Sequence, residues 1–346
     1  MAKVLVTGAN GHIGANLVRD LQSHGYEVVP LVRSGANVAG LDGLGLSYAR
    51  GDVLDPDAVK AAMQGCEVVF HAAAPYATWA KDPSTIIEPA VRGTENVLRA
   101  AKTLGVRRIV VTSSCNAVGF TRDPGKPLDE TSWNDRTKSP YIKAKNEQER
   151  RAWALAKELG LDVVTVLPTT VLGRYDYKKT PTTAPFLDAF AHKGPVPFAM
   201  NLVDVRDVAR AHVLAAEKGE SGERYLAGGD NVDIPTLAGL IEKHTGRRPA
   251  EGLPPRIVLR TVAFVSEAFS SITGKPPMIT RELLDDADGS SPLFDCSKAR
   301  EKLGLSPRGA EEVVLETLRW AVFQGWLPKL PAAMREKVPA DPDWRH

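Results

Sequence analysis

The sequence predicts an α/β protein built on a doubly wound parallel sheet, with a smaller and mainly helical second lobe. Short β-branched runs alternate with longer helical patterns, and the runs are apolar throughout rather than alternately polar. Strands are expected at Lys3–Val6, Glu27–Val32, Glu67–His71, Arg108–Thr112 and Asp162–Leu167. Helices are expected between them at His12–Ser23, Pro56–Met63, Glu88–Leu104 and Tyr141–Leu159.

The character of the sequence changes after Gly173. Residues 174–201 are rich in Pro, Thr and Lys and are expected to lie on the substrate side. Residues 202–228 are predicted to return to the sheet domain as a short strand followed by a helix, Val205–Ala216. The predicted domains are therefore residues 1–173 with 202–228, and residues 174–201 with 229–346. Helices of the second lobe are expected at Ile234–Thr245, Ile257–Thr273 and Ala310–Phe323, before an extended tail from Pro328.

Composition and charge argue against several classes of function. Lys plus Arg number 44 and Asp plus Glu number 42 in 346 residues, so no strong field favours nucleic acid or a membrane as a partner. The cysteines, 3 in all, are too few for a disulfide framework or a metal cluster and fit a reducing, cytoplasmic setting. The first strand begins almost at Met1, which leaves no room for a signal peptide. His71, His192 and His212 lack metal-ligand spacing, so we expect no metal site.

A glycine motif follows the first predicted strand and opens the first predicted helix. Gly8 permits a tight turn, Gly11 lets backbone N–H groups approach a pyrophosphate, and Gly14 allows close helix–strand packing. The spacing is Gly-x-x-Gly-x-x-Gly, and its strand–turn–helix setting indicates a dinucleotide site. Contacts to the same dinucleotide are predicted for Asn10, His12 and Ile13.

The end of the second strand bears on which dinucleotide binds. NAD-binding folds place an acidic residue there to hold the ribose 2′-hydroxyl, whereas this chain has Arg33 followed by Ser34. A guanidinium and a hydroxyl suit a 2′-phosphate, so NADP(H) is the expected cofactor. The alternative is that Arg33 is a solvated surface residue. Further contacts are predicted from Asp52 and Val53 near the adenine, and from Ala72, Ala73 and Ala74 near the ribose that carries the nicotinamide.

Acid–base chemistry is indicated by Tyr141 and Lys145, which lie four residues apart and therefore on one face of a helix. An ammonium beside a phenol favours the phenolate, so we expect the pKa of Tyr141 to move toward the working range. Ser114, at the carboxyl end of a strand, would orient the reacting oxygen, with Ser113 as the competing candidate. Such a set interconverts an alcohol and a carbonyl, although the Tyr-x-x-x-Lys pair alone is a common surface pattern.

Taken together, these motifs resemble those of an extended short-chain dehydrogenase/reductase. They are Thr-Gly-x-x-Gly-x-x-Gly from Thr7, Gly-Asp-Val from Gly51, His-Ala-Ala-Ala-Pro from His71, Thr-Ser-Ser from Thr112 and Tyr-x-x-x-Lys from Tyr141. Within that superfamily, residues 87–98, 129–133 and 167–173 resemble the group of dihydroflavonol, cinnamoyl-CoA and aldehyde reductases. Residues 79–83 and 222–225 resemble a branch similar to sugar epimerases. The resemblance implies a Rossmann-type fold.

The same resemblance implies a role for each site residue. Tyr141 would be the acid/base, Lys145 would bind the nicotinamide ribose and lower the tyrosine pKa, and Ser114 would polarise the substrate oxygen. Thr112, Pro168 and Val171 would complete the cofactor site. Two long helices of the sheet domain would pair in a homodimer.

The chain departs from the superfamily pattern in places. Ala90 stands where many members have Asn, so a relay through that side chain is absent. Ala144 stands where Ser is usual in the Tyr-x-x-Ser-Lys motif. Arg174 replaces a frequent Pro, and we expect it to place a charge near the mouth of the pocket.

Three functions fit these residues. The favoured one is an NADP(H)-dependent oxidoreductase that reduces an aldehyde or ketone, with a small carbonyl compound as substrate. The second is a nucleotide-sugar epimerase or dehydratase with tightly held NAD, against which Arg33 counts. The third is a non-catalytic dinucleotide sensor, although such proteins typically lose the tyrosine or the lysine. Tyr76 and Trp79 indicate an aromatic or otherwise apolar substrate, with packing in a lid as the alternative. Much of the pocket is expected from residues 75–79, residues 175–185 and the helices after Gly252.

Overall fold

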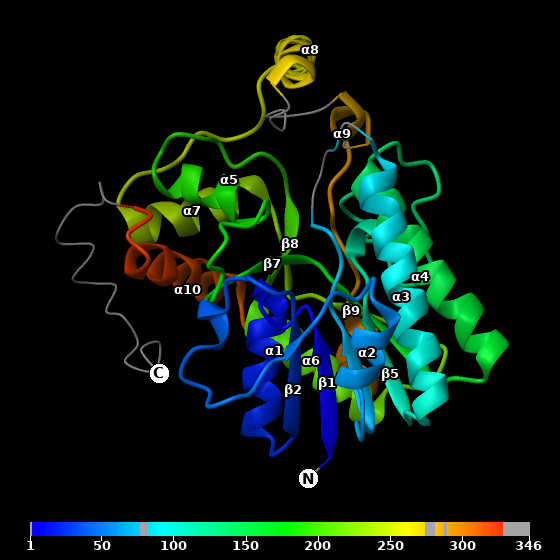
Figure 1. Ribbon diagram of the computed structural model, residues 1–346. Coiled ribbons are helices and arrows are strands. Elements are labelled where there is room, and N and C mark those ends of the chain that lie inside the picture. Colours follow the sequence, from blue (N-terminus) through cyan, green and yellow to red (C-terminus); the bar gives the residue numbers. More distant parts are fainter. Residues whose placement is uncertain (1, 77–79, 81, 274–280, 287–288, 328–346) are drawn as a thin grey trace.

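The computed structural model describes residues 2–76, 80, 82–273, 281–286 and 289–327. A main parallel sheet is flanked by helices, and a smaller mixed sheet lies beyond the carboxyl ends of its strands (Figure 1). The extended tail predicted from Pro328 lies outside the described residues. No helix within the described ranges is both long and apolar enough to cross a membrane.

The main sheet has the order β3-β2-β1-β4-β5-β6-β9, and every neighbouring pair of its strands is parallel. Its strands are β1 (Lys3–Thr7), β2 (Glu27–Val32), β3 (Ala49–Arg50), β4 (Val68–His71), β5 (Arg108–Thr112), β6 (Val163–Pro168) and β9 (Arg224–Ala227). The order runs outward in both directions from β1, so the chain changes direction between β1 and β4. Ligands of open α/β sheets bind at such a point, beyond the carboxyl ends of the strands. The doubly wound sheet predicted from the sequence is thus confirmed.

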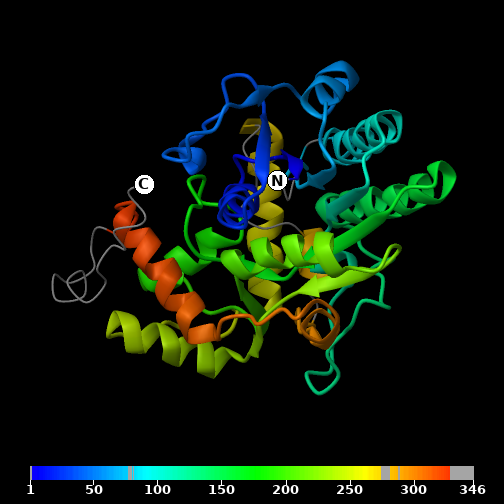
Figure 2. The same cartoon turned by 90° about the horizontal axis from the view of Figure 1, so that it is seen from below.

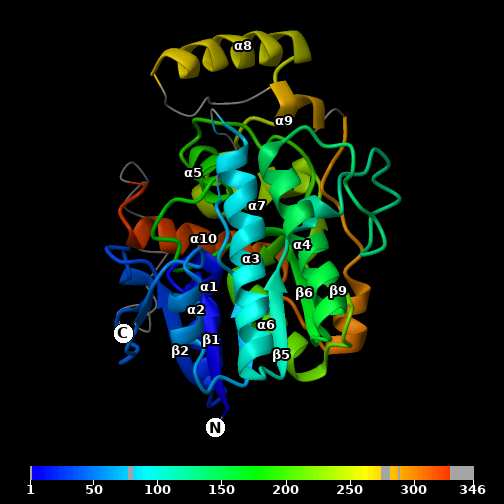
Figure 3. The same cartoon turned by 45° about the vertical axis from the view of Figure 1, so that its right-hand side comes forward.

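Helices cover both faces of this sheet, as the continuous apolar strands require. On one face α1 (His12–Ser23) packs with α6 (Val205–Lys218) against Val4 and Val6 of β1. On the other face α2 (Pro56–Ala62), α3 (Ser84–Leu104) and α4 (Pro140–Leu159) pack over Leu5, Val69 and Ile109. Figure 3 shows α3 and α4 side by side along this face.

The smaller sheet carries the second lobe. It has the order β10-β8-β7, with bounds β7 (Thr170–Leu172), β8 (Met200–Asp204) and β10 (Asp230–Val232). The helices of this lobe are α5 (Thr183–Phe190), α7 (Ile234–Thr245), α8 (Arg256–Thr273), α9 (Arg281–Asp286) and α10 (Ala310–Phe323). Figure 2, a view from below, shows α7 and α10 on the side of the molecule opposite α3 and α4. Residues 202–228 were expected to return to the sheet domain. Their strand, β8, instead joins the small sheet, whereas α6 packs on the main sheet and β9 is a strand of it.

Local sequence signals fix the helix ends that matter for the site. Ser139 and Pro140 begin α4, so Tyr141 lies in its first turn, close to the carboxyl edge of the sheet. Gly160 ends α4 in the left-handed conformation (φ 62), as expected for a C-terminal glycine. Short helical turns lie at η1 (Ala39–Leu41), η2 (Cys115–Ala117) and η3 (Ala299–Leu303).

Candidate active site

A cavity of about 1010 Å³ lies at the carboxyl edge of the main sheet, between the sheet and the smaller lobe. All residues that the sequence predicted for the dinucleotide and for catalysis line it, with the exception of Ser34. Segments scattered between residues 8 and 171 of the sequence therefore meet in one cavity. Ser34 is exposed and is not part of the cavity wall.

The glycine loop provides a close backbone approach at one end of the cavity. Gly8 has φ +68, and a Cβ built on it would lie 2.8 Å from the backbone nitrogen of Ala73. A Cβ on Gly14 would overlap the carbonyl oxygen of Gly8. Gly11 donates its N–H to that same oxygen at 2.9 Å, which tightens the turn before α1. Side chains at Gly8 and Gly14 would therefore collide with neighbouring backbone atoms and open the tight turn that presents the helix N-terminus to a pyrophosphate.

The polar residues of the loop are held by backbone groups. His12 Nε2 lies 3.0 Å from the carbonyl oxygen of Arg174, and Asn10 donates to the carbonyl oxygen of Asn37 at 2.9 Å. Burial lowers the pKa of His12 although the Asp176 carboxylate acts in the opposite direction. His12 is therefore a neutral ring that fixes the loop against the segment after β7.

Two cations lie at the adenosine side of the site. Arg33 and Lys178 both line the cavity, and the pKa of Lys178 is lowered by partial burial and by the neighbouring Arg33 guanidinium. Like charges placed together in this way suit a dianionic group between them. Lys178 was not predicted from the sequence, where the only signal was the Lys-rich segment in which it lies. Asp52 lines the cavity and accepts a hydrogen bond from the backbone N–H of Leu54 at 3.0 Å.

Tyr141 has its ring against that of Tyr76, with centroids 5.2 Å apart and planes inclined by 49°. Burial raises the pKa of the Tyr141 phenol, Tyr76 raises it further, and a hydrogen bond with Ser114 acts in the opposite direction. The expectation that this pKa is lowered in the protein itself was therefore wrong, because loss of hydration outweighs any charge nearby. A buried phenol stays protonated, which is the form that a general acid needs.

The two adjacent serines have different surroundings. Ser113 Oγ donates to Glu149 Oε2 at 2.5 Å, and Glu149 also accepts from Thr165 Oγ1 at 2.9 Å and Arg224 Nε at 2.8 Å. The Ser113 hydroxyl is thus part of a buried hydrogen-bond network with α4, β6 and β9. Ser114 instead caps η2 and shares a hydrogen bond with Tyr141. The geometry favours Ser114 as the hydroxyl that meets a substrate oxygen.

Lys145 lies one turn beyond Tyr141 on α4 and is buried. Its Nζ donates to the carbonyl oxygen of Thr112 and to Gln148 Oε1, each at 3.1 Å. Burial lowers the pKa of Lys145 to about 8, partly offset by the Glu149 carboxylate. Lys143, the other lysine of the segment, is exposed and does not line the cavity.

Comparison with known proteins identifies the family. The pattern of the NAD-dependent epimerase/dehydratase family matches residues 4–228. The chain belongs to this family. A putative dihydroflavonol 4-reductase of Synechocystis sp. is 33% identical over 330 residues, which cover 93% of this chain and 95% of the relative. Cinnamoyl-CoA reductase 1 of Petunia hybrida is 38% identical over 256 residues, covering 67% of this chain and 75% of the relative.

A solved structure agrees over the whole fold. The crystal structure of gox2253 has a TM-score of 0.81 and 34% sequence identity, with 94% of this chain and 99% of that chain covered. The family is NAD(P)-dependent, and the two relatives named above are reductases of its extended short-chain dehydrogenase/reductase type. The resemblance drawn from the motifs is thereby confirmed at the level of the family.

In this family member the smaller lobe contributes apolar side chains to the same cavity. Phe186 of α5, Phe198, Met200 of β8, and Leu237 and Ile241 of α7 line it. Of the segments expected to supply the pocket, residues 75–79 and 175–185 both contribute described residues to the lining. The helices after Gly252 do not, because no described residue of α8, α9 or α10 lines the cavity, so that part of the expectation was wrong.

Of the two aromatic residues predicted for the pocket, Tyr76 and Trp79, the structure describes only the first. Tyr76 lines the cavity, and its hydroxyl lies 2.5 Å from Thr182 Oγ1. Trp79 lies outside the described residues.

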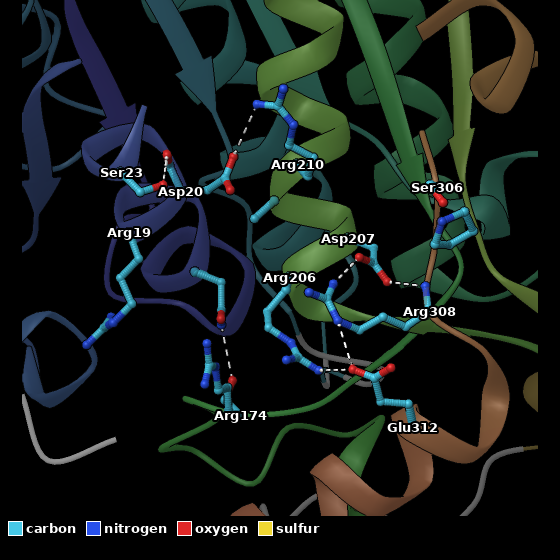
Figure 4. A pocket seen from close by; sticks show the side chains of 13 residues that line it. Arg19, Asp20, Ser23, Arg174, Arg206, Asp207, Arg210, Ser306, Arg308 and Glu312 are labelled. Carbon is cyan, nitrogen blue, oxygen red and sulfur yellow. Dashed lines mark hydrogen bonds and ion pairs between the residues drawn. The ribbon is translucent and has the colours of Figure 1, made fainter. Parts of the chain in front are cut away.

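A second cavity, of about 820 Å³, lies between α1, α6 and the segment before α10 (Figure 4). Arg174 lines this cavity and not the first one, so the expectation that it charges the pocket mouth was wrong. Two arginines here pair with carboxylates that also line the cavity: Arg206 lies 3.3 Å from Glu312, and Arg308 pairs with Asp207. These pairs join α6 to the first turn of α10 and to the segment before it.

His212 has the contacts of a structural residue. His212 is buried, with Nε2 at 2.8 Å from Thr112 Oγ1 and Nδ1 at 2.7 Å from the carbonyl oxygen of Val208. Within the described part of the chain no group of three or more His, Cys, Asp or Glu side chains could hold a metal ion.

Proposed function

We propose that the protein is an NADP(H)-dependent oxidoreductase that reduces an aldehyde or ketone to an alcohol, in the manner of dihydroflavonol and aldehyde reductases. The observation that carries this proposal is the hydrogen-bonded pair Ser114–Tyr141, with Lys145 one turn away, in the wall of the cavity that begins at the glycine loop. Acid–base groups at the carboxyl edge of a dinucleotide-binding sheet can exchange a proton with a carbonyl oxygen while the cofactor transfers a hydride.

The residues present fit NADP(H). Gly8 and Gly14 allow the tightly packed turn at the helix N-terminus on which a pyrophosphate binds, and Arg33 with Lys178 supplies the charge that a 2′-phosphate needs. Thr169 adds a buried hydroxyl on the cavity wall that has no hydrogen-bond partner among the described residues, and it is available to a polar group such as a carboxamide.

The chain's own residues then perform the acid–base part of the reaction. NADPH, when bound, supplies the hydride to the carbonyl carbon. Ser114 donates a hydrogen bond to the carbonyl oxygen and fixes its position. Tyr141, kept protonated by burial, transfers its proton to the same oxygen as the alcohol forms. The Lys145 ammonium favours the phenolate that is left, and solvent returns the proton to Tyr141.

The substrate is expected to be largely apolar. The cavity wall beyond Tyr141 has Phe186, Phe198 and Leu237, and a pocket of such side chains favours aromatic or aliphatic carbonyl compounds over nucleotide sugars. The relatives named for dihydroflavonol and cinnamoyl-CoA are in keeping with a ring-bearing substrate.

The stoichiometry of the cofactor tests the proposal against its alternatives. Purified protein mixed with NADPH and a panel of aromatic aldehydes and ketones should convert one NADPH per alcohol formed, with a lower rate on NADH. A nucleotide-sugar epimerase would interconvert UDP-sugars without net cofactor consumption, and a non-catalytic sensor would bind NADPH and turn over nothing. Either of those results would overturn the proposal.

A further inference from the structure

The second acceptor of the Lys145 ammonium is a buried glutamine one turn further along α4. Gln148 is 1% exposed, its Oε1 accepts from Lys145 Nζ at 3.1 Å, and its Nε2 donates to Thr94 Oγ1 at 3.1 Å. Both ends of the amide are therefore occupied. The spacing of three residues places Lys145 and Gln148 on the same face of the helix.

The orientation of this amide is fixed by the directions of the neighbouring hydrogen bonds. Thr94 Oγ1 donates its single proton to the carbonyl oxygen of Ala90 at 2.9 Å, so its lone pairs must accept from Gln148 Nε2 and from His71 Nε2, the latter at 3.0 Å. A flipped amide would bring its NH₂ group to the ammonium of Lys145 and its oxygen to the lone pairs of Thr94. Neither contact is tolerable in a buried site.

The same chain of bonds continues to the strand end that lines the cofactor cavity. The backbone N–H of Ala73 donates to Thr7 Oγ1 at 3.2 Å, and that hydroxyl donates to His71 Nδ1 at 2.8 Å. His71 is a neutral ring with its proton on Nε2, since burial lowers the pKa of His71 to about 3. From Gln148 to Ala73, the amide, imidazole, hydroxyl and backbone donors of this path each have one acceptor, so this part of the path has one arrangement.

We propose that Gln148 is a positioning residue, which holds the Lys145 ammonium at the cavity wall and ties it through Thr94 and His71 to the strand end at Ala73. The inference rests on the proposed function, since it assigns Gln148 a part in the reaction through Lys145. Gln148 itself touches neither substrate nor cofactor. Without it, the ammonium would keep only its hydrogen bond to the carbonyl oxygen of Thr112 among the described residues.

Other charged groups face Lys145 and must stay constant in any test. The Glu149 carboxylate on α4 favours the ammonium, while His71 on β4 and His212 on α6 are neutral rings whose pKa values the ammonium itself helps to lower. Glu149 is held by Ser113 and Arg224, so replacing Gln148 leaves its charge in place.

The decisive measurement is a ¹³C NMR titration of the lysine Cε signals in the cofactor-free protein, with the Lys145 signal assigned by Lys145→Met. Gln148→Leu removes an acceptor of the charged form and should move the Lys145 midpoint downward by about 1 pH unit. Gln148→Glu adds a carboxylate and should move it upward by a similar amount. Glu147→Gln, an exposed change on the same helix, should leave it in place.

Kinetics provide the second readout. Gln148→Leu should lower kcat by about 10- to 100-fold because the ammonium is misplaced, and Gln148→Glu should recover part of the loss. Thr94→Val combined with Gln148→Leu should cost little more than either change alone, since both break one path.

The outcomes separate this inference from the proposed function. Midpoints unchanged in both Gln148 variants would overturn the positioning role, whatever the activity. If Gln148→Leu does not fold, Gln148→Glu decides alone, and an unshifted midpoint there overturns the role. If the wild type reduces no carbonyl compound, the proposed function fails, while opposite shifts in the two variants would still support the contact with Lys145.

Discussion

The paired cations at the cavity rim lead to a prediction about cofactor choice. Arg33→Ala and Lys178→Ala should each weaken NADPH binding and leave NADH binding nearly unchanged, because only NADPH carries the 2′-phosphate. A hydrogen bond to a charged group contributes about 1.5–3 kcal/mol, which corresponds to roughly 10- to 100-fold in affinity. Both side chains are exposed, so screening places each loss near the lower end, at about tenfold.

The assay is the dissociation constant for each dinucleotide, followed by the change in protein fluorescence on binding. Arg50→Ala is the matched control, because Arg50 is an exposed arginine at the end of the neighbouring strand β3 that does not line the cavity. Raising the salt concentration should shrink the preference for NADPH in the wild type. The reasoning is refuted if the double variant still prefers NADPH, or if NADH binding falls by the same factor.

Further predictions concern the site and its support. Ser114→Ala should lower kcat by about 10²- to 10³-fold, whereas Ser113→Ala should spare kcat and lower the melting temperature, because it removes a partner of buried Glu149; equal kcat losses would contradict this division. The pKa of Lys145 falls from 10.5 in the unfolded chain to about 8 in the fold, so the unfolded state binds more protons between these values. Relative to Lys145→Met, the wild type should therefore gain stability as the pH rises from about 8 to about 10.5, and denaturation at two pH values checks this. Gly14→Ala should abolish NADPH binding or folding, because its Cβ meets the Gly8 carbonyl; unchanged binding by calorimetry would remove Gly14 from the cradle.

The parts of the fold that sequence predicted well are those with strong local signals. The buried strands from β1 to β6 that are longer than three residues have β-branched runs of their own, and the long helices α3 and α4 end at glycines in the left-handed conformation. Strand β8 also has an apolar run, but its place in the small sheet is decided by pairing with β7 and β10, which no local pattern records. The short strand β3, two residues long, depends on β2 alone.

The residues of the candidate site also differ in whether a local sequence pattern predicts them. Tyr141 and Lys145 lie on one helix, so their spacing alone predicts that they share a face. Gln148 and Lys178 were missed because their roles depend on partners far away in sequence, Thr94 for the first and Arg33 for the second. The pKa of Tyr141 was misjudged for the same reason, since the extent of its burial comes from tertiary packing.

The central claim is that Tyr141 provides the proton for carbonyl reduction. Tyr141→Phe removes the hydroxyl and keeps the ring, so NADPH binding should change less than about threefold while single-turnover reduction falls by about 10²- to 10⁴-fold. Tyr76→Phe, which removes a neighbouring hydroxyl bonded to Thr182, serves as the control and should retain turnover. A single-turnover measurement with saturating NADPH and the best carbonyl compound gives both numbers. Turnover at the wild-type rate in Tyr141→Phe, with NADPH bound, would contradict the account.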